Sequence, residues 1–163
     1  MTATSDDAST WRGLYVRARD KVVPAPEDDV RVARGYPGWA DKGTVVDGMR
    51  LTILTKDAKC AVGAEIRVIH VLEVVEPGRK VYIMGPKPVF GEYVDQAPAT
   101  PPPPEGEDPF VPSTYNGMTV PSPAVDYGYE ITQYRFERPG VHEIWWRLPP
   151  LESNVLRLEV LAV

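Results

Sequence analysis

Alternation of apolar and polar residues is the main pattern in the chain after Gly48. In the segment Ala64–Val75 one face is apolar apart from His70, and the charged residues all fall on the other face. A period of two residues is typical of β-strands, whose successive side chains point to opposite faces of a sheet. The segment ends at Glu76-Pro77-Gly78, a sequence typical of a type II turn. It is therefore predicted to form one long strand.

Six further segments have strand character: Met49–Ile53, Lys80–Met84, Val89–Val94, Tyr129–Phe136, Val141–Leu148 and Asn154–Leu161. No segment of ten residues shows the 3.6-residue period of a helix. Short strands separated by turn sequences at intervals of roughly ten residues are typical of β-sandwiches. We therefore predict an all-β domain over residues 48–163, an antiparallel sandwich of about seven strands.

Two segments interrupt this regularity. Residues 1–47 begin with a polar tail, predicted to be disordered, and continue as short apolar pieces between prolines and glycines. They predict an irregular arm with one or two short strands, packed on the domain through aromatic side chains such as Tyr36. Residues 95–124 carry nine of the 18 prolines. They predict a long, structureless Pro-rich loop, and loops of this length are commonly functional or disordered.

Composition narrows the class of protein. The 163 residues fit one domain, 43% of them are hydrophobic, and 18 prolines with 13 glycines exclude a helical bundle. A net charge of −5 argues against nucleic acid or an anionic membrane as partner. No apolar run approaches the ~18 residues that span a bilayer. Without a signal-peptide pattern, and with Cys60 as the single cysteine, a cytoplasmic protein free of disulfides is expected.

The end of the chain resembles a known class of domain. Residues Phe136–Trp146, which contain Pro139-Gly140, are followed by Ser153-Asn154 and an alternating strand to Val160. This order resembles the last two strands of bacterial immunoglobulin-like or fibronectin-like domains, and Gly63–Gly78 is similar to their second strand and turn. His142 stands where such domains usually have tyrosine. The resemblance implies an immunoglobulin-like fold over residues 48–163 and implies no particular function.

Four ionisable side chains are candidates for acid–base chemistry. His70 and His142 are expected on the inward faces of strands in facing sheets, where either could act with Asp126 or Glu92. Two satisfied core histidines are the simpler interpretation, because a zinc site needs three or four ligands and the chain has no suitable cluster. We therefore predict neither a metal nor a cofactor. The lone Cys60 is likewise expected to be inert.

Aromatic residues are stronger candidates for a binding surface. If Trp146 points inward, alternation places Trp145 outward, and an exposed tryptophan is typical of a partner surface. The aromatic side chains beside the predicted loop that could contribute to recognition are Tyr93, Phe110, Tyr115 and Tyr127.

These observations favour a non-enzymatic module that acts through protein–protein contacts. One version of this hypothesis is a homodimer formed across the sheet that bears Trp145. Two alternatives stay open. One is a small acid–base enzyme or small-molecule-binding protein with a pocket beside residues 95–124, and the other is a sugar-binding module that stacks its ligand on Trp145 and tyrosines.

Overall fold

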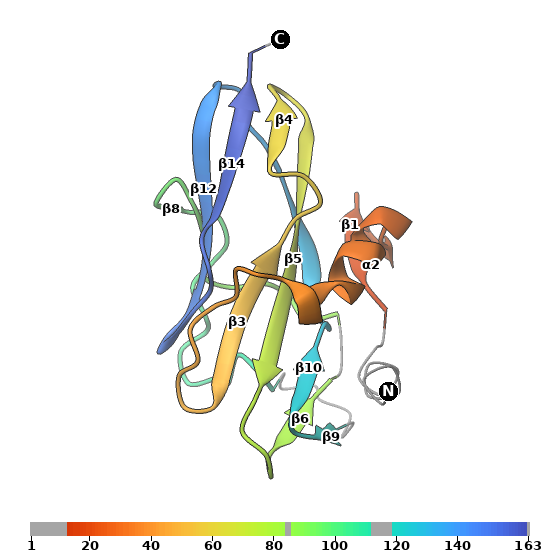
Figure 1. Cartoon of the computed structure of the whole chain (residues 1–163), viewed down its shortest axis with the longest axis vertical. Helices are drawn as coiled ribbons and strands as arrows, with labels where there is room; N and C mark the ends of the chain where they lie inside the picture. The colour runs from red at the N-terminus through yellow and green to blue at the C-terminus, as the bar shows by residue number, and fades with distance from the viewer. Residues whose placement is uncertain (1–12, 84–85, 112–118, 163) are drawn as a thin grey trace.

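Two β-sheets face each other across the main hydrophobic core (Figure 1). The computed structural model describes residues 13–83, 86–111 and 119–162. Within these ranges the chain is mostly strand, with the single α-helix α2 (Glu27–Arg34) and one turn of 3-10 helix, η1 (Tyr36–Gly38). The all-β prediction is therefore confirmed.

The first sheet is built around β5 (Glu65–Val74). The strands β3 (Met49–Leu54) and β10 (Ala124–Asp126) both pair with residues 72–74 of β5, so they lie on its opposite sides. β11 (Glu130–Arg135) continues the pairing of β10 along β5. The long apolar strand predicted from the sequence is thus the middle of this sheet.

The second sheet has β12 (Gly140–Leu148) at its centre. In spatial order its strands are β4 (Lys59–Ala61), β14 (Leu156–Leu161), β12, β7 (Glu92–Val94) and β8 (Ala97–Pro98), with β13 (Leu151–Glu152) paired to the end of β12. A separate ribbon of β6 (Lys80–Tyr82) and β9 (Thr119–Pro121) lies at one end of the molecule.

Inward-facing side chains of both sheets form the main core. The residues of its centre are less than 1% exposed and come from four strands: Leu51, Ile53, Val68, Ile144, Trp146 and Leu158. Burial of such side chains contributes roughly 1.5–3 kcal/mol each to folding. The alternation that predicted Trp146 inside and its neighbour outside follows from this packing.

Each of the seven predicted strands overlaps an observed one, but two features differ from the prediction. The sheets are mixed, because β1 (Tyr15–Ala18) pairs in parallel with β11 and β4 pairs in parallel with β14. Fourteen strands are present in the described ranges, many of two to four residues. Each parallel pair joins strands that are distant in sequence, so no hairpin turn fixes their relative direction.

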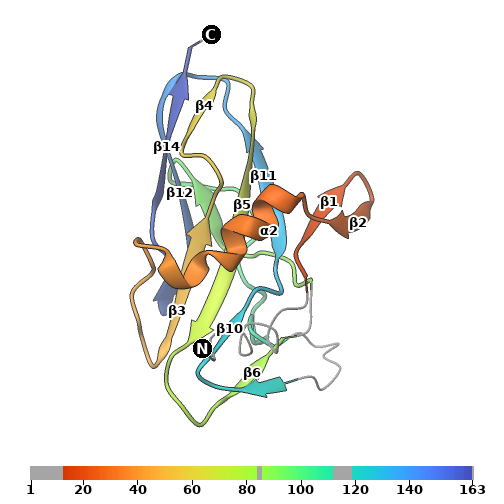
Figure 2. The same cartoon turned by 45° about the vertical axis from the view of Figure 1, so that its right-hand side comes forward.

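The arm is more regular than predicted. β1 and β2 (Lys21–Pro24) form a hairpin, and α2 follows and packs across the outer face of the first sheet (Figure 2). We expected no helix, and that was wrong, because eight residues are too few to show a helical period. The signals of a helix are instead at its two ends. Three acidic residues follow Pro26 in the first turn, and the last turn contains Arg31 and Arg34.

The segment 95–124 is also less irregular than predicted. Its described residues include β8, β9 and β10. The backbone N–H of Gly91 donates to Pro101 O at 2.8 Å, and that of Ala99 donates to Glu92 O at 2.8 Å. Prolines conceal such pairings from a sequence pattern, because they still accept hydrogen bonds while lacking a donor.

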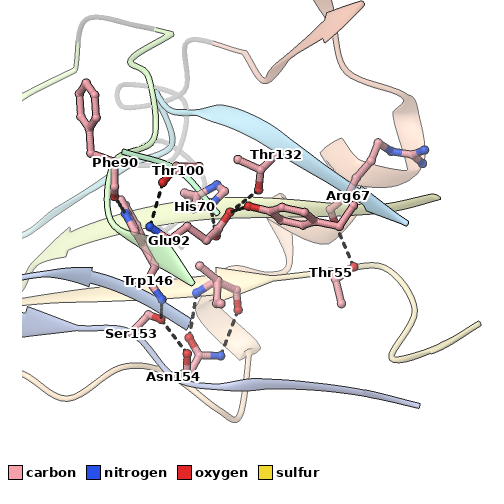
Figure 3. Close-up of polar contacts among 12 residues, drawn as sticks. Thr55, Arg67, His70, Phe90, Glu92, Thr100, Thr132, Trp146, Ser153 and Asn154 are labelled. Carbon is pink, nitrogen blue, oxygen red and sulfur yellow. Dashed lines mark hydrogen bonds and ion pairs between the residues drawn. The ribbon is translucent and has the colours of Figure 1, made fainter. Parts of the chain in front are cut away.

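The pair Ser153-Asn154 connects the two sheets (Figure 3). The Asn154 side chain accepts from Ile53 N–H at 2.8 Å and donates to Ile53 O at 3.0 Å. The Ser153 hydroxyl accepts from Trp146 N–H at 2.9 Å and donates to Asn154 O at 2.7 Å. The backbone of β3 is thereby tied to that of β12.

No helix in the described residues is long and apolar enough to cross a membrane.

Candidate functional site

Glu92 and His70 form a buried pair between the two sheets (Figure 3). Glu92 lies on β7, and His70 Nε2 donates to its carboxylate at 2.6 Å. Thr132 and Tyr134 of β11 donate to the other carboxylate oxygen at 2.6 and 2.5 Å. Both members of the pair have fully buried side chains. One carboxylate therefore links strands of both sheets.

The protonation of this pair follows from its surroundings. Burial raises the pKa of Glu92, but the charge of His70 and the three hydrogen bonds outweigh it and hold the pKa below its usual value. Burial and the adjacent carboxylate raise the pKa of Tyr134, so that it stays a hydroxyl donor. Glu92 is thus an ionised acceptor that three donors satisfy.

Gly91 positions Glu92 against the neighbouring strand. A Cβ atom at Gly91 would lie 2.1 Å from the carbonyl oxygen of Arg147, and the φ angle of Gly91 is +75°. Glycine is the residue that adopts this conformation without strain and permits such a close approach. Beside the pair, the ring of Trp146 packs edge-on against His70 at 4.9 Å and donates from Nε1 to Phe90 O.

The two histidines lie on inward strand faces, as expected, but each has its own partners. The His142 ring packs against Phe136 at 4.3 Å and its side chain is 13% exposed, while Nδ1 contacts Asp95 Oδ2 at 2.6 Å and Nε2 contacts Arg138 O at 2.8 Å. A carboxylate and a carbonyl oxygen both accept, so these contacts require the imidazolium form, which donates from both nitrogens. The hydrogen bond to Asp95 and then that to Arg138 O raise the pKa of His142.

Asp126 belongs to a third, separate cluster. Its carboxylate contacts Lys87 Nζ at 2.5 Å and accepts from Gly128 N–H at 2.8 Å. Lys87 also lies 4.7 Å from the centre of the Tyr129 ring. Burial raises the pKa of Asp126 against the opposing effect of Lys87. The four ionisable candidates therefore occupy three places, and only His70 and Glu92 meet.

The remaining candidates lie apart from these clusters. Tyr127 is 2% exposed and packs edge-on against Tyr36 at 6.3 Å, so it offers no surface to a partner. Burial raises the pKa of Cys60, which disfavours a thiolate nucleophile. Tyr115 lies outside the described residues. Among those described, no group of three or more His, Cys, Asp or Glu side chains could hold a metal.

Trp145 faces outward but is half-buried, since its neighbours enclose it. Its ring centre lies 5.9 Å from that of Tyr93 on β7, and the Arg147 guanidinium lies 5.1 Å from it. Apolar side chains of the described part of the arm pack on the opposite sheet. A groove of about 370 Å³ runs beside the ring, and it is lined by Tyr93, Gln96, Glu143, Trp145, Arg147 and Val155.

Charged side chains flank Trp145 on β12. Glu143, two residues before it, accepts from Arg157 Nε at 3.0 Å. The buried Nε of Arg147, two residues after it, lies 4.0 Å from Glu152 Oε2 and has no hydrogen-bond partner within the described part of the chain. We did not predict Arg147 as a site residue, although its place on the same strand face as Trp145 was readable from the alternation.

A second hollow lies beside the segment 95–124, where the small-molecule alternative expected one. It has a volume of about 440 Å³ and includes Asp108, Phe110 and Val111 of that segment. Neither His70 nor Glu92 lines it, so it does not join the buried pair to a ligand site.

Comparisons with known proteins find no match to a family model, to a curated protein or to a solved structure.

Proposed function

We propose that the protein is a non-enzymatic interaction module that self-associates through the outer face of its second sheet. The single observation that carries this proposal is the groove of about 370 Å³ around the half-buried Trp145. Tryptophan, tyrosine and arginine are the residues enriched at the energetic centres of protein interfaces, and all three line the groove.

A second copy is the partner that the charges of this face fit. Glu143 and Arg147 lie two residues to either side of Trp145 on one strand face. A two-fold axis that passes beside Trp145, perpendicular to β12, would put Glu143 of each copy opposite Arg147 of the other. Within the chain, Arg147 already lies near Glu152 and Glu143 near Arg157, and the contacts across the axis would extend these ion pairs. Such self-complementarity is what a two-fold interface requires.

The other function classes have less support. Acid–base chemistry by His70 or Glu92 would require access to substrate, and both side chains are fully buried. Sugar stacking requires a free aromatic face, whereas Arg147 and Tyr93 already flank the Trp145 ring. We also propose that the fold is immunoglobulin-like, supported by two facing sheets and by the Ser153-Asn154 connection.

Replacement of Trp145 tests the proposal. Because Trp145 is already half-buried, we expect burial of the rest of its ring to contribute on the order of 1–2 kcal/mol, which corresponds to about one decade in a dissociation constant. We expect wild-type protein to dimerise in sedimentation equilibrium and Trp145→Glu to be monomeric at the same concentrations. Circular dichroism checks that the variant folds. A wild-type protein that is monomeric at high micromolar concentration contradicts the proposal.

Charge reversal tests the two-fold arrangement itself. Glu143→Arg and Arg147→Glu should each weaken self-association, because each places like charges opposite one another. An equimolar mixture of the two variants should form a heterodimer, since all four residues then meet opposite charges. Glu159→Arg, on the same sheet but outside the groove, is the matched control and should dimerise as wild type does. A mixture that stays monomeric excludes this two-fold arrangement.

A further inference from the structure

The hollow beside the segment 95–124 has the features of a second, independent binding site. Its volume of about 440 Å³ falls within the ~300–1,000 Å³ usual for small-molecule sites. It lies at the junction of β3, β5, β6 and the segment that contains Phe110. The groove at Trp145 shares none of its lining residues.

The interior of this hollow is apolar. Leu72 and Val74 of β5 and Val81 of β6 form its floor, and each is 2–3% exposed, so most of the accessible apolar lining comes from other residues. Met49 and Phe110, which are partly buried against the core, complete the apolar lining together with Val111. Transfer of an apolar group from water onto such a surface is favourable by roughly 25 cal/mol per Å². The body of a ligand here would therefore be hydrocarbon.

The charged residues of the hollow are mainly basic. Arg79 and Lys80 lie beside Val81, and Asp108 is the acidic residue among the lining side chains. Asp108 already accepts from Phe110 N–H at 2.8 Å, which engages its carboxylate within its own segment. Arg79 uses one guanidinium nitrogen on Asp47 O. Lys80 is exposed at the rim of the hollow, and no ion pair of its ammonium is present among the described residues.

From this arrangement we infer that the hollow binds a small amphipathic anion, with its apolar body against the partly exposed Met49, Phe110 and Val111 and a single carboxylate at Lys80. The chain as a whole carries a net charge of −5, so attraction of an anion to this site depends on its local basic residues. A neutral or cationic ligand of the same body would gain the apolar contact but not the ion pair.

Decanoate is a suitable probe, with decan-1-ol and decylamine as neutral and cationic probes of the same chain length. Isothermal titration calorimetry of the full chain should give a micromolar dissociation constant for decanoate and at least fivefold weaker binding for the other two. Absence of decanoate binding below millimolar concentration overturns the inference, and so does equal binding of decylamine.

Two variants assign the binding to this hollow. Lys80→Glu should weaken decanoate binding at least fivefold, while Lys59→Glu, an equally exposed lysine on β4, should leave it unchanged. Val111→Trp should fill the hollow and weaken binding of all three probes. If Lys80→Glu and Val111→Trp both bind decanoate as wild type does, the site lies elsewhere and the inference is wrong. Trp145→Glu does not alter this hollow. The outcome of the self-association experiment is therefore independent of the outcome of the decanoate titrations.

Discussion

Glu92 shows how a single buried charge can organise a core. Its carboxylate accepts from His70, Thr132 and Tyr134, which come from two strands of the facing sheet. A buried ion pair is costly to desolvate and is retained only when hydrogen bonds satisfy its remaining atoms. The carboxylate end meets this condition, whereas the Nδ1 atom of His70 is buried without a partner among the described residues.

Removal of the carboxylate is expected to be severely destabilising. Glu92→Ala leaves a buried histidine and two buried hydroxyls without an acceptor, so we expect a loss of ~3–5 kcal/mol in the free energy of unfolding. Tyr134→Phe, which removes one donor and leaves the charge paired, should cost only ~1 kcal/mol. Urea denaturation monitored by circular dichroism measures both. Equal losses for the two variants would contradict a central role for the charge.

The sequence located these residues but not their partners. Alternation identified His70 as the polar exception on an apolar strand face, and Glu92 was among the acidic candidates. Their pairing depends on how β7 is set against β5, since the two residues are 22 positions apart in the sequence. Likewise, Asp126 could not be assigned to Lys87, because their segments are joined through contacts that no local pattern specifies.

At the scale of elements, the turn between β7 and β8 is held in place by His142. Asp95 and Gln96 at this turn have φ angles of +49° and +70°. Such angles are typical of two-residue hairpin turns, where Asp and Asn are tolerated. Asp95 contacts His142 through one oxygen and accepts from Glu143 N–H through the other. The hairpin that carries Tyr93 is thereby fixed to β12.

This contact predicts a pH dependence of stability. The pKa of His142 is raised in the folded state, so its contribution is fully present below the unfolded value of about 6.5 and is lost as pH rises through the folded value. The pKa of Asp95 is lowered, since its bonds to His142 and to Glu143 N–H outweigh the opposing effect of burial. Its contribution is therefore present above its unfolded value of about 3.9 and is lost as pH falls through the folded one.

We expect the pair to stabilise the fold most between about pH 4 and 6.5. The difference in unfolding free energy between wild type and His142→Gln should be larger at pH 6 than at pH 9. Thermal or urea melts at the two pH values measure it, and comparison with the variant cancels the other titrating groups. A difference that is constant with pH would show that His142 does not bind Asp95 as an imidazolium.

The helix α2 shows where element prediction failed. Its eight residues contain Val30-Arg31-Val32, which alternate as a strand does. Tertiary contacts decide the outcome, because Asp29 is fully buried and contacts Arg67 of β5, and Ala33 is also fully buried. Such contacts join segments about forty residues apart, so a pattern within the arm could not indicate them.

At the scale of the whole molecule, patterning predicted the strands that fill the core and missed those at the margins. Core strands such as β5 and β12 must alternate, because one face of each packs on the opposite sheet. Edge pieces such as β4 and β8 bury little and need no such pattern. The same holds for the two candidate sites. Alternation along β12 predicted the outward position of Trp145, whereas the lining of the second hollow comes from segments distant in sequence, which no local pattern brings together.

Asn154 has a consequence for how the folded protein behaves in concentrated solution. A strand with unpaired backbone groups is a template onto which another chain can add, and this is a common start of fibril growth. On β3 the side-chain amide of Asn154 occupies the N–H and C=O of Ile53, and so it takes the place of an incoming strand. We therefore predict that the Asn154 side chain hinders templated aggregation at β3.

Asn154→Ala would remove the two side-chain hydrogen bonds to Ile53 while leaving the core residues in place. We expect it to nucleate thioflavin-positive aggregates sooner than Leu158→Ala, a core variant that loses more unfolding free energy by leaving a cavity. If the two variants aggregate in the order of their stabilities instead, unfolding governs the process and Asn154 has no protective role. Protection by Asn154 would mean that resistance to fibril growth in this fold depends on a single amide rather than on overall stability.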